Sequence, residues 1–90
     1  MKAIKGFKLR PLGDEFILIG ESVDLINFNK MITINESAGY LWQQIQSLDS
    51  FDEAKLTELL LAEYEVSPEQ AQKDAHETAQ RWLDAGIVTA

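Results

Sequence analysis

The chain has 90 residues, a hydrophobic fraction of 46%, no cysteine and a formal net charge of −7. A chain of this length forms one domain with a small core, so we expect residues 1–90 to be a single domain. Without cysteine there is no disulfide, thiolate metal ligand or cysteine nucleophile. We expect a soluble cytoplasmic protein, because no apolar run is long enough for a signal peptide or for the roughly 20 residues of a membrane span.

The charge is unevenly distributed along the chain. Residues 1–34 contain five basic and four acidic groups, whereas residues 35–90 contain three basic and eleven acidic groups. Phosphate binding depends on Lys and Arg, so the acidic second part argues against nucleic acid as a partner. A solvated acidic surface is the simpler interpretation, and it is compatible with a basic partner.

Two strands are predicted near the start of the chain. Residues 7–12 alternate apolar and basic side chains, as in a half-buried strand. Pro11 cannot donate a ladder hydrogen bond, so this strand lies at a sheet edge or ends there. Gly13 and Asp14 predict a turn, and the apolar residues 16–19 then form the second strand.

A third strand is predicted at Met31–Ile34, with Ile32 and Ile34 on one face and Met31 and Thr33 on the other. The preceding residues 25–30 form either a loop or an extension of this strand.

Helical patterns follow the strands. Asn35 is a good N-cap, because its side chain can accept a hydrogen bond from a free amide at the helix start. The first helix then carries apolar residues at spacings of three and four, which place them on one face. They are Ala38, Leu41, Trp42, Ile45 and Leu48.

The second helix is predicted to begin at a capping box formed by Ser50 and Glu53 and to run to about residue 64. Its buried stripe is predicted to be Leu56, Leu59, Leu60 and Tyr64.

The third helix has the clearest boundaries. Ser67 is its cap, Pro68 occupies the first helical position, Gln70 completes a capping box, and Gly86 ends the helix. Residues 87–88 are expected to fold back onto the core. The buried stripe is predicted to be Ala71, Ala75, Ala79, Trp82 and Leu83.

Strands followed by helices predict an α+β domain. We expect a winged-helix-like arrangement in which a three-stranded antiparallel sheet is followed by three helices.

No catalytic or metal site is predicted. His76 is the single histidine, and a metal site normally needs three or four converging ligands. The five glycines match neither dinucleotide- nor nucleotide-binding patterns. Both tryptophans lie on predicted core stripes. We therefore expect neither catalytic residues nor a cofactor.

Four segments in order resemble the PqqD-like family, and together they span residues 6–88. The longest, NFNKMITINESAGYLW at residues 27–42, runs from a strand into an Asn-Glu helix cap and an aromatic-rich helix. The other three are residues 6–10, 64–67 and 82–88. The departures are Ile34 where Leu is usual, Lys30 where Gly is frequent, and Asp49-Ser50 where an Asp-Gly turn is common; they concern the loops more than the fold.

The resemblance implies a peptide-recognition domain of ribosomal peptide modification. Such domains hold the leader of a precursor peptide and present its core to a modifying enzyme, often a radical S-adenosylmethionine protein. The first-named members act in pyrroloquinoline quinone biosynthesis, and the sequence does not distinguish that pathway from a related one.

A three-stranded sheet would leave an edge at Met31–Ile34, where an extended leader could add as a fourth strand. We therefore predict Met31, Ile32, Thr33 and Ile34 as peptide-binding residues on the strand side. On the third helix we predict Asp74, Glu77, Thr78 and Arg81, the acids for basic leader residues and the arginine for an acidic one. Equally, Glu77 and Arg81 could form an ordinary i, i+4 ion pair.

Three alternatives to a leader-binding adaptor follow from the same sequence. The first is a winged-helix DNA-binding protein, which the acidic third helix argues against. The others are a small enzyme or metalloprotein, and a subunit that bridges two proteins without a leader peptide. An exposed edge in a short chain would also permit a strand-swapped homodimer.

Overall fold

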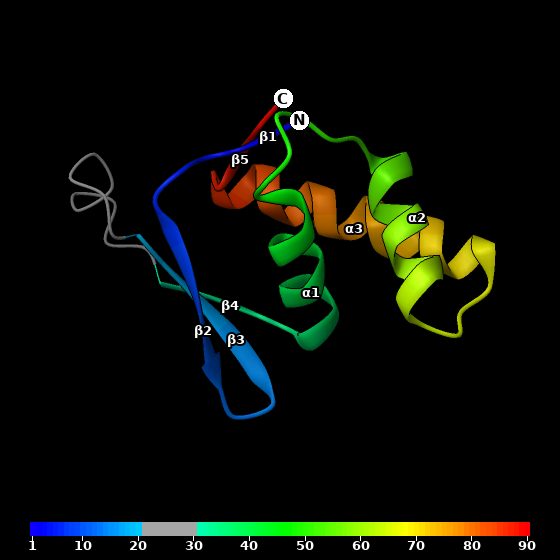
Figure 1. Cartoon of the computed structure of the whole chain (residues 1–90), viewed down its shortest axis with the longest axis horizontal. Coiled ribbons are helices and arrows are strands. Elements are labelled where there is room, and N and C mark those ends of the chain that lie inside the picture. The colour runs from blue at the N-terminus through cyan, green and yellow to red at the C-terminus, as the bar shows by residue number, and fades with distance from the viewer. Residues whose placement is uncertain (21–30) are drawn as a thin grey trace.

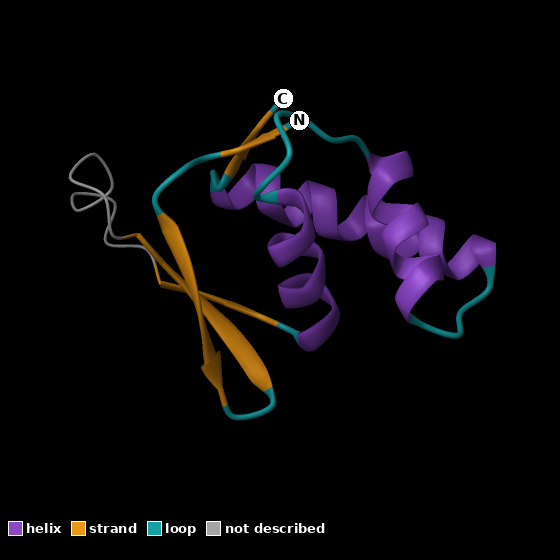
Figure 2. Ribbon diagram, viewed as in Figure 1, coloured by secondary structure: helices purple, strands orange, loops and turns teal. Residues whose placement is uncertain are grey.

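The computed structural model describes residues 1–20 and 31–90, and the predicted strand extension at 25–30 lies outside them. Figure 1 shows the sheet to one side of the helices, and Figure 2 shows the same two layers by secondary structure. This arrangement confirms the predicted α+β class. The elements are β1 (Lys2–Ala3), β2 (Phe7–Leu12), β3 (Glu15–Gly20), β4 (Met31–Ile34), α1 (Glu36–Ile45), α2 (Glu53–Glu63), α3 (Pro68–Ala85) and β5 (Val88–Thr89).

The main sheet is antiparallel with the strand order β2-β3-β4. Strands β2 and β3 form a hairpin in which Leu12 lies opposite Glu15. The turn between them needs Gly13, whose φ of 63° is in the left-handed region. All three predicted strands are confirmed, and the second is one residue longer at each end than predicted.

Helix α1 begins as predicted, because the amide of Ala38 donates to Asn35 Oδ1 at 2.9 Å. Four of the five stripe residues are buried and the fifth, Leu48, is 37% exposed. The prediction for Leu48 was wrong because the helix ends at Ile45, so the helical periodicity no longer applies beyond it.

The start of α2 differs from the prediction. Its cap is Asp52 rather than Ser50, and Asp52 Oδ1 accepts from the amide of Lys55 at 2.8 Å. The reason is Phe51, whose buried ring lies in the core. Its backbone amide donates to the Met1 carbonyl at 2.8 Å, so Phe51 is held outside the helix. Within the predicted stripe, Leu56 and Leu60 are buried, while Leu59 and Tyr64 are partly buried.

Helix α3 confirms its predicted cap, since the Gln70 amide donates to Ser67 Oγ at 3.2 Å. The prediction that the Gln70 side chain completes the capping box was wrong, because that side chain donates instead to Asp74 Oδ1 at 2.8 Å. Gly86 ends the helix with φ 77°. The stripe is buried except for Leu83, which is partly buried.

A second, two-stranded sheet was not predicted. Strand β1 pairs with β5, and the Ile4 amide donates to the Ile87 carbonyl at 2.9 Å. Ile87 and Val88 are buried, as expected for residues that fold back onto the core. This pairing brings the two ends of the described chain together (Figure 1).

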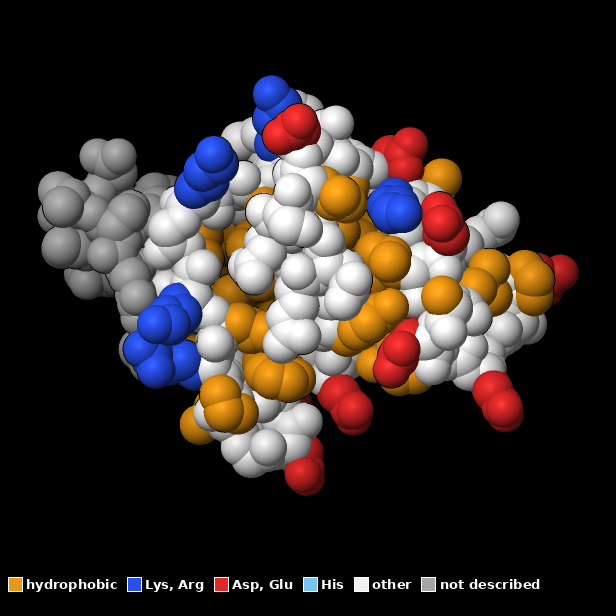
Figure 3. All heavy atoms as spheres, viewed as in Figure 1, with side chains coloured by type: hydrophobic (Ala, Val, Ile, Leu, Met, Phe, Trp, Pro, Cys, Tyr) orange, Lys and Arg blue, Asp and Glu red, His pale blue; other side chains and the backbone are white. Residues whose placement is uncertain are grey.

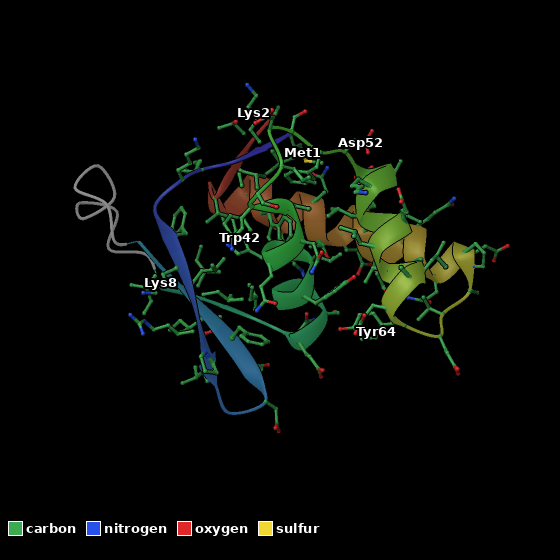
Figure 4. The ribbon with its side chains drawn as sticks, viewed as in Figure 1. Met1, Lys2, Lys8, Trp42, Asp52 and Tyr64 are labelled. Carbon is green, nitrogen blue, oxygen red and sulfur yellow. The ribbon has the colours of Figure 1, made fainter. Side chains whose placement is uncertain are left out.

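Aromatic rings join the helices to the sheet. Trp42 packs edge-on against Trp82 at a centroid distance of 5.3 Å and against Phe7 at 6.3 Å. Figure 4 shows Trp42 on the inner side of α1. Gly39 of α1 lies against Phe16 of β3 so closely that an added Cβ would collide with the ring. The sheet and α1 are therefore in tight contact.

Candidate functional site

Strand β4 is an edge of the main sheet. In the strand order β2-β3-β4 it pairs only with β3, and no other described strand lies on its outer side. An unpaired strand edge exposes a row of backbone donors and acceptors. The geometry of the β2–β3 hairpin determines which groups of β4 these are.

The hairpin sets the hydrogen-bonding phase of the sheet. Two residues, Gly13 and Asp14, connect Leu12 to Glu15, and the residues that flank a two-residue turn form a hydrogen-bonded pair. Bonded and non-bonded pairs alternate along antiparallel strands, so the next pair, Pro11 with Phe16, is non-bonded. Proline fits this position because it has no amide hydrogen to donate.

The same alternation reaches β4. The backbone groups of Phe16 and Leu18 point away from β2 and toward their partners on β4, Ile34 and Ile32. The intervening residue, Thr33, therefore directs its own N–H and C=O toward the open side of the sheet. Its side chain is exposed.

Beside this open edge lies a cavity of about 320 Å³ between the sheet and α3. Its sheet side is formed by Ile32, Thr33 and Ile34 of β4 together with Glu15 of β3. Asn35 and Ala38 close it where β4 leads into α1. The edge and the cavity therefore form one continuous groove, which we call the β4–α3 groove.

The helix side of the β4–α3 groove consists of Thr78, Arg81, Trp82 and Ala85. Spacings of three and four place these residues on one face of α3. Trp82 is a core residue at 2% exposure, so it forms the floor, whereas Arg81 is exposed.

The groove has two different ends. In Figure 1, α3 runs in the direction opposite to β4. Ala85 is the last residue of α3, so it lies toward the start of β4, and Thr78, about two turns earlier, lies toward the end of β4. Glu15 lies beside the end of β4, since its neighbour Phe16 pairs with Ile34. The groove is thus apolar near Ile32 and Ala85 and polar near Thr78 and Glu15, with Arg81 between them.

The structure brings five of the eight predicted residues into the groove. These are Ile32, Thr33, Ile34, Thr78 and Arg81. The side chain of Met31 is not described, although its backbone belongs to β4.

The other two predicted residues, Asp74 and Glu77, do not line the cavity. Asp74 is on the same side of the helix as Arg81, but it lies about 16 Å from Ala85 along the axis. A four-residue strand spans only about 13 Å. Between the described residues Glu77 and Arg81 there is no ion pair, so the alternative interpretation of this pair was wrong.

Sequence reasoning missed five groove residues: Glu15, Asn35, Ala38, Trp82 and Ala85. Three of them belong to helix stripes or helix ends, where apolar residues indicate a core in general. The other two, the helix cap Asn35 and the strand end Glu15, likewise carry no sequence signal for a cavity. Only the packing of α3 across β4 makes them part of a groove.

Charged side chains lie on the surface of both parts of the molecule. Lys2, Lys5, Lys8 and Arg10, in or next to β1 and β2, are exposed. Figure 3 shows acidic side chains scattered over the helical side, with a basic group among them. Arg81 is the only basic residue and Glu15 the only acidic residue among those that line the β4–α3 groove. No ion pair joins Arg81 to another described residue.

The Tyr64 phenol lies away from the groove and has a perturbed pKa. Burial raises the pKa of the Tyr64 phenol, with smaller contributions from Glu36, Glu63 and Tyr40. The Tyr64 ring packs edge-on against Tyr40 at 5.9 Å.

His76 lies on α3 outside the groove, and its exposed Nδ1 is 2.7 Å from Glu53 Oε1 on α2. Within residues 1–20 and 31–90 no three potential metal ligands come together. None of the described helices is long and apolar enough to cross a membrane.

The fold and the groove together define an α+β domain with an open sheet edge beside a helix. The family whose model matches the chain is described as coenzyme PQQ synthesis protein D (PqqD), and the match covers residues 15–88. The chain therefore belongs to the PqqD family, as its sequence resemblance predicted. The matched residues run from β3 to β5 and include the whole β4–α3 groove.

A solved structure with the same fold is that of TbiB1 in complex with the TbiA(beta) leader peptide. The two structures agree with a TM-score of 0.75 at 12% sequence identity, over 100% of this chain and 96% of that one. At this identity the likeness establishes the fold alone. A search of the curated proteins found no match to the sequence.

Proposed function

We propose that this protein is a non-catalytic adaptor that binds the leader of a precursor peptide and presents it to a modifying enzyme. The observation that carries the proposal is the open edge of β4 beside the β4–α3 groove. Membership of the PqqD family supports it, and so does the shared fold with a protein solved in complex with a leader peptide.

In the proposed complex the leader lies along β4 as a fourth strand of the sheet. The outward N–H and C=O of Thr33 would bond its backbone and so contribute affinity that is independent of sequence. Each such hydrogen bond contributes a net free energy of about 0.5–1.5 kcal/mol. Strand β4 is only four residues long, so few such bonds can form. Side chains in the groove must therefore supply much of the affinity and all of the selection.

The proposed binding residues are the four of β4 and, on α3, Thr78 and Arg81 within the groove. Asp74 and Glu77 would act only on a leader long enough to extend past the end of β4. We expect a dissociation constant in the sub-micromolar to micromolar range, by analogy with other peptide-docking modes.

The benefit to the partner enzyme is a higher effective concentration of substrate. A leader held here keeps the attached core peptide near the enzyme, so modification becomes faster without any catalytic residue in this chain. We propose a radical S-adenosylmethionine enzyme as the partner, in pyrroloquinoline quinone biosynthesis or a related peptide pathway.

An amide NMR titration tests the proposal. The probe is a synthetic leader from a precursor gene adjacent to the one for this chain. We expect the largest shifts at residues 31–34 and along α3 from Thr78 to Ala85. Shifts confined to α2 or to β1 and β5 would contradict binding at β4.

A further inference from the structure

The groove also predicts which side chains a bound strand should carry. We infer that the β4–α3 groove selects an apolar and an acidic side chain two residues apart in the peptide. The inference rests on the proposed function, because it describes the side chains of the peptide proposed to lie on β4.

The first step is the phase of the added strand. In either strand direction, the peptide residue that lies opposite Thr33 projects to the same face of the sheet as Thr33, because paired residues do so. The Thr33 side chain is exposed, whereas Ile34 is buried toward the helices. The two peptide residues on either side of the Thr33 partner therefore project into the groove.

The second step is spacing. These two peptide residues are separated by two positions, which is about 6.6 Å along a strand. On α3, Arg81 and Ala85 are four residues apart, which is about 6 Å along the helix. One peptide side chain therefore reaches the groove at the level of Ala85 while the other reaches it at the level of Arg81.

The third step is the chemistry at each level. Among the lining residues, Trp82 lies one helical turn before Ala85, and Ile32 is the strand residue at this end of the groove. The lining there is therefore apolar, and the small alanine leaves space for an apolar side chain. Burial of apolar surface there contributes about 25 cal/mol per Å². At the next level the exposed guanidinium of Arg81 can bond a carboxylate in a bidentate pair.

Glu15 restricts where the acid can lie. It is at the polar end of the groove, beyond Ile34. A carboxylate in the bound strand at that end would face a like charge, which is unfavourable. The acidic side chain therefore belongs at the level of Arg81 and not one step farther along.

The test uses three synthetic nine-residue peptides with a threonine-rich host sequence. Each has leucine at positions three and seven, so that the spacing holds for either direction of the strand. The central residue is glutamate, lysine or glutamine. A fourth peptide has the same composition as the glutamate peptide, but its leucine and glutamate are three positions apart. Binding is measured by calorimetry, and thermal unfolding checks that each protein variant folds.

We expect the glutamate peptide to bind the unsubstituted protein about tenfold more tightly than the lysine peptide, from the strength of charge-assisted pairing. Arg81→Glu should reverse that order, and Arg81→Gln should remove the difference. The peptide with the altered spacing should bind no better than the glutamine peptide.

The outcomes separate the inference from the proposed function. If a natural leader shifts residues 31–34 while the glutamate, lysine and glutamine peptides bind equally or not at all, the selection inference is overturned and strand addition stands. If neither natural leader nor designed peptide perturbs β4, the proposed function is overturned and the inference with it.

Discussion

The two edges of the main sheet have opposite properties. Strand β2 is six residues long, and its outward-facing backbone includes Pro11, which has no amide hydrogen. Its side chains Lys8 and Arg10 are exposed, and Figure 4 shows Lys8 on the outer side of the sheet. Proline and charged side chains are the usual means by which proteins prevent pairing at an edge.

Strand β4 has neither feature. It carries the uncharged residues Met31–Ile34, directs the N–H of Thr33 outward, and lies beside a cavity. The contrast shows that one sheet can have one edge protected against foreign strands and one edge that lacks this protection. The predictions below test this difference, beginning with the largest expected effect.

The packing that supports β4 should be the most sensitive point. In Gly39→Val the new side chain would collide with Phe16, which pairs directly with Ile34 of β4. We expect the free energy of unfolding to fall by about 2–3 kcal/mol, as for other overpacked cores. Chemical denaturation measures this. Phe16→Leu in the same protein should recover part of the loss, and simple additivity of the two changes would refute direct contact.

Proline should act differently at the two edges. Thr33→Pro removes an outward amide of β4, and we expect leader affinity to fall about tenfold, while Thr33→Val keeps the amide and the affinity. On the other edge, Pro11→Thr restores an outward amide and should leave binding unchanged. Calorimetric titration measures the leader affinity of the three variants. If Pro11→Thr altered that affinity as much as Thr33→Pro, the two edges would be equivalent in binding and the comparison would be wrong.

Filling the cavity should weaken binding less. In Ala85→Leu the added atoms occupy the apolar end of the groove, and we expect about a fivefold loss of leader affinity, or about 1 kcal/mol. The control is Asp84→Leu, at an exposed neighbouring position that does not line the cavity. Equal losses in both variants would show that the cavity is not used.

The smallest effect concerns pH, at a residue well away from the sheet (Figure 4). Because the pKa of Tyr64 is raised in the folded protein, the unfolded chain loses that proton first as pH rises above about 10. The unfolded state then binds fewer protons, so the free energy of unfolding decreases with pH. Denaturation at a series of alkaline pH values should show a shallower decrease for Tyr64→Phe. Identical slopes would contradict the assigned shift.

Local patterns were sufficient for most of the fold. Period-two alternation and the turn at Gly13 predicted the strands, and the Asn35 and Ser67 caps predicted two helix starts to the residue. The short strands β1 and β5 could not be predicted, because two residues have no periodicity and pair only across the full length of the chain. The α2 cap also depended on a distant contact, between Phe51 and Met1.

The sequence by itself determined the class of the domain, the position of β4 and the identity of its edge residues, because these depend on interactions between near neighbours. Tertiary structure decided which part of α3 lies across β4, and so replaced Asp74 and Glu77 by Trp82 and Ala85 as groove residues. The physical reason is that a helical pattern specifies direction around an axis, whereas position along the axis is set only by packing against the sheet.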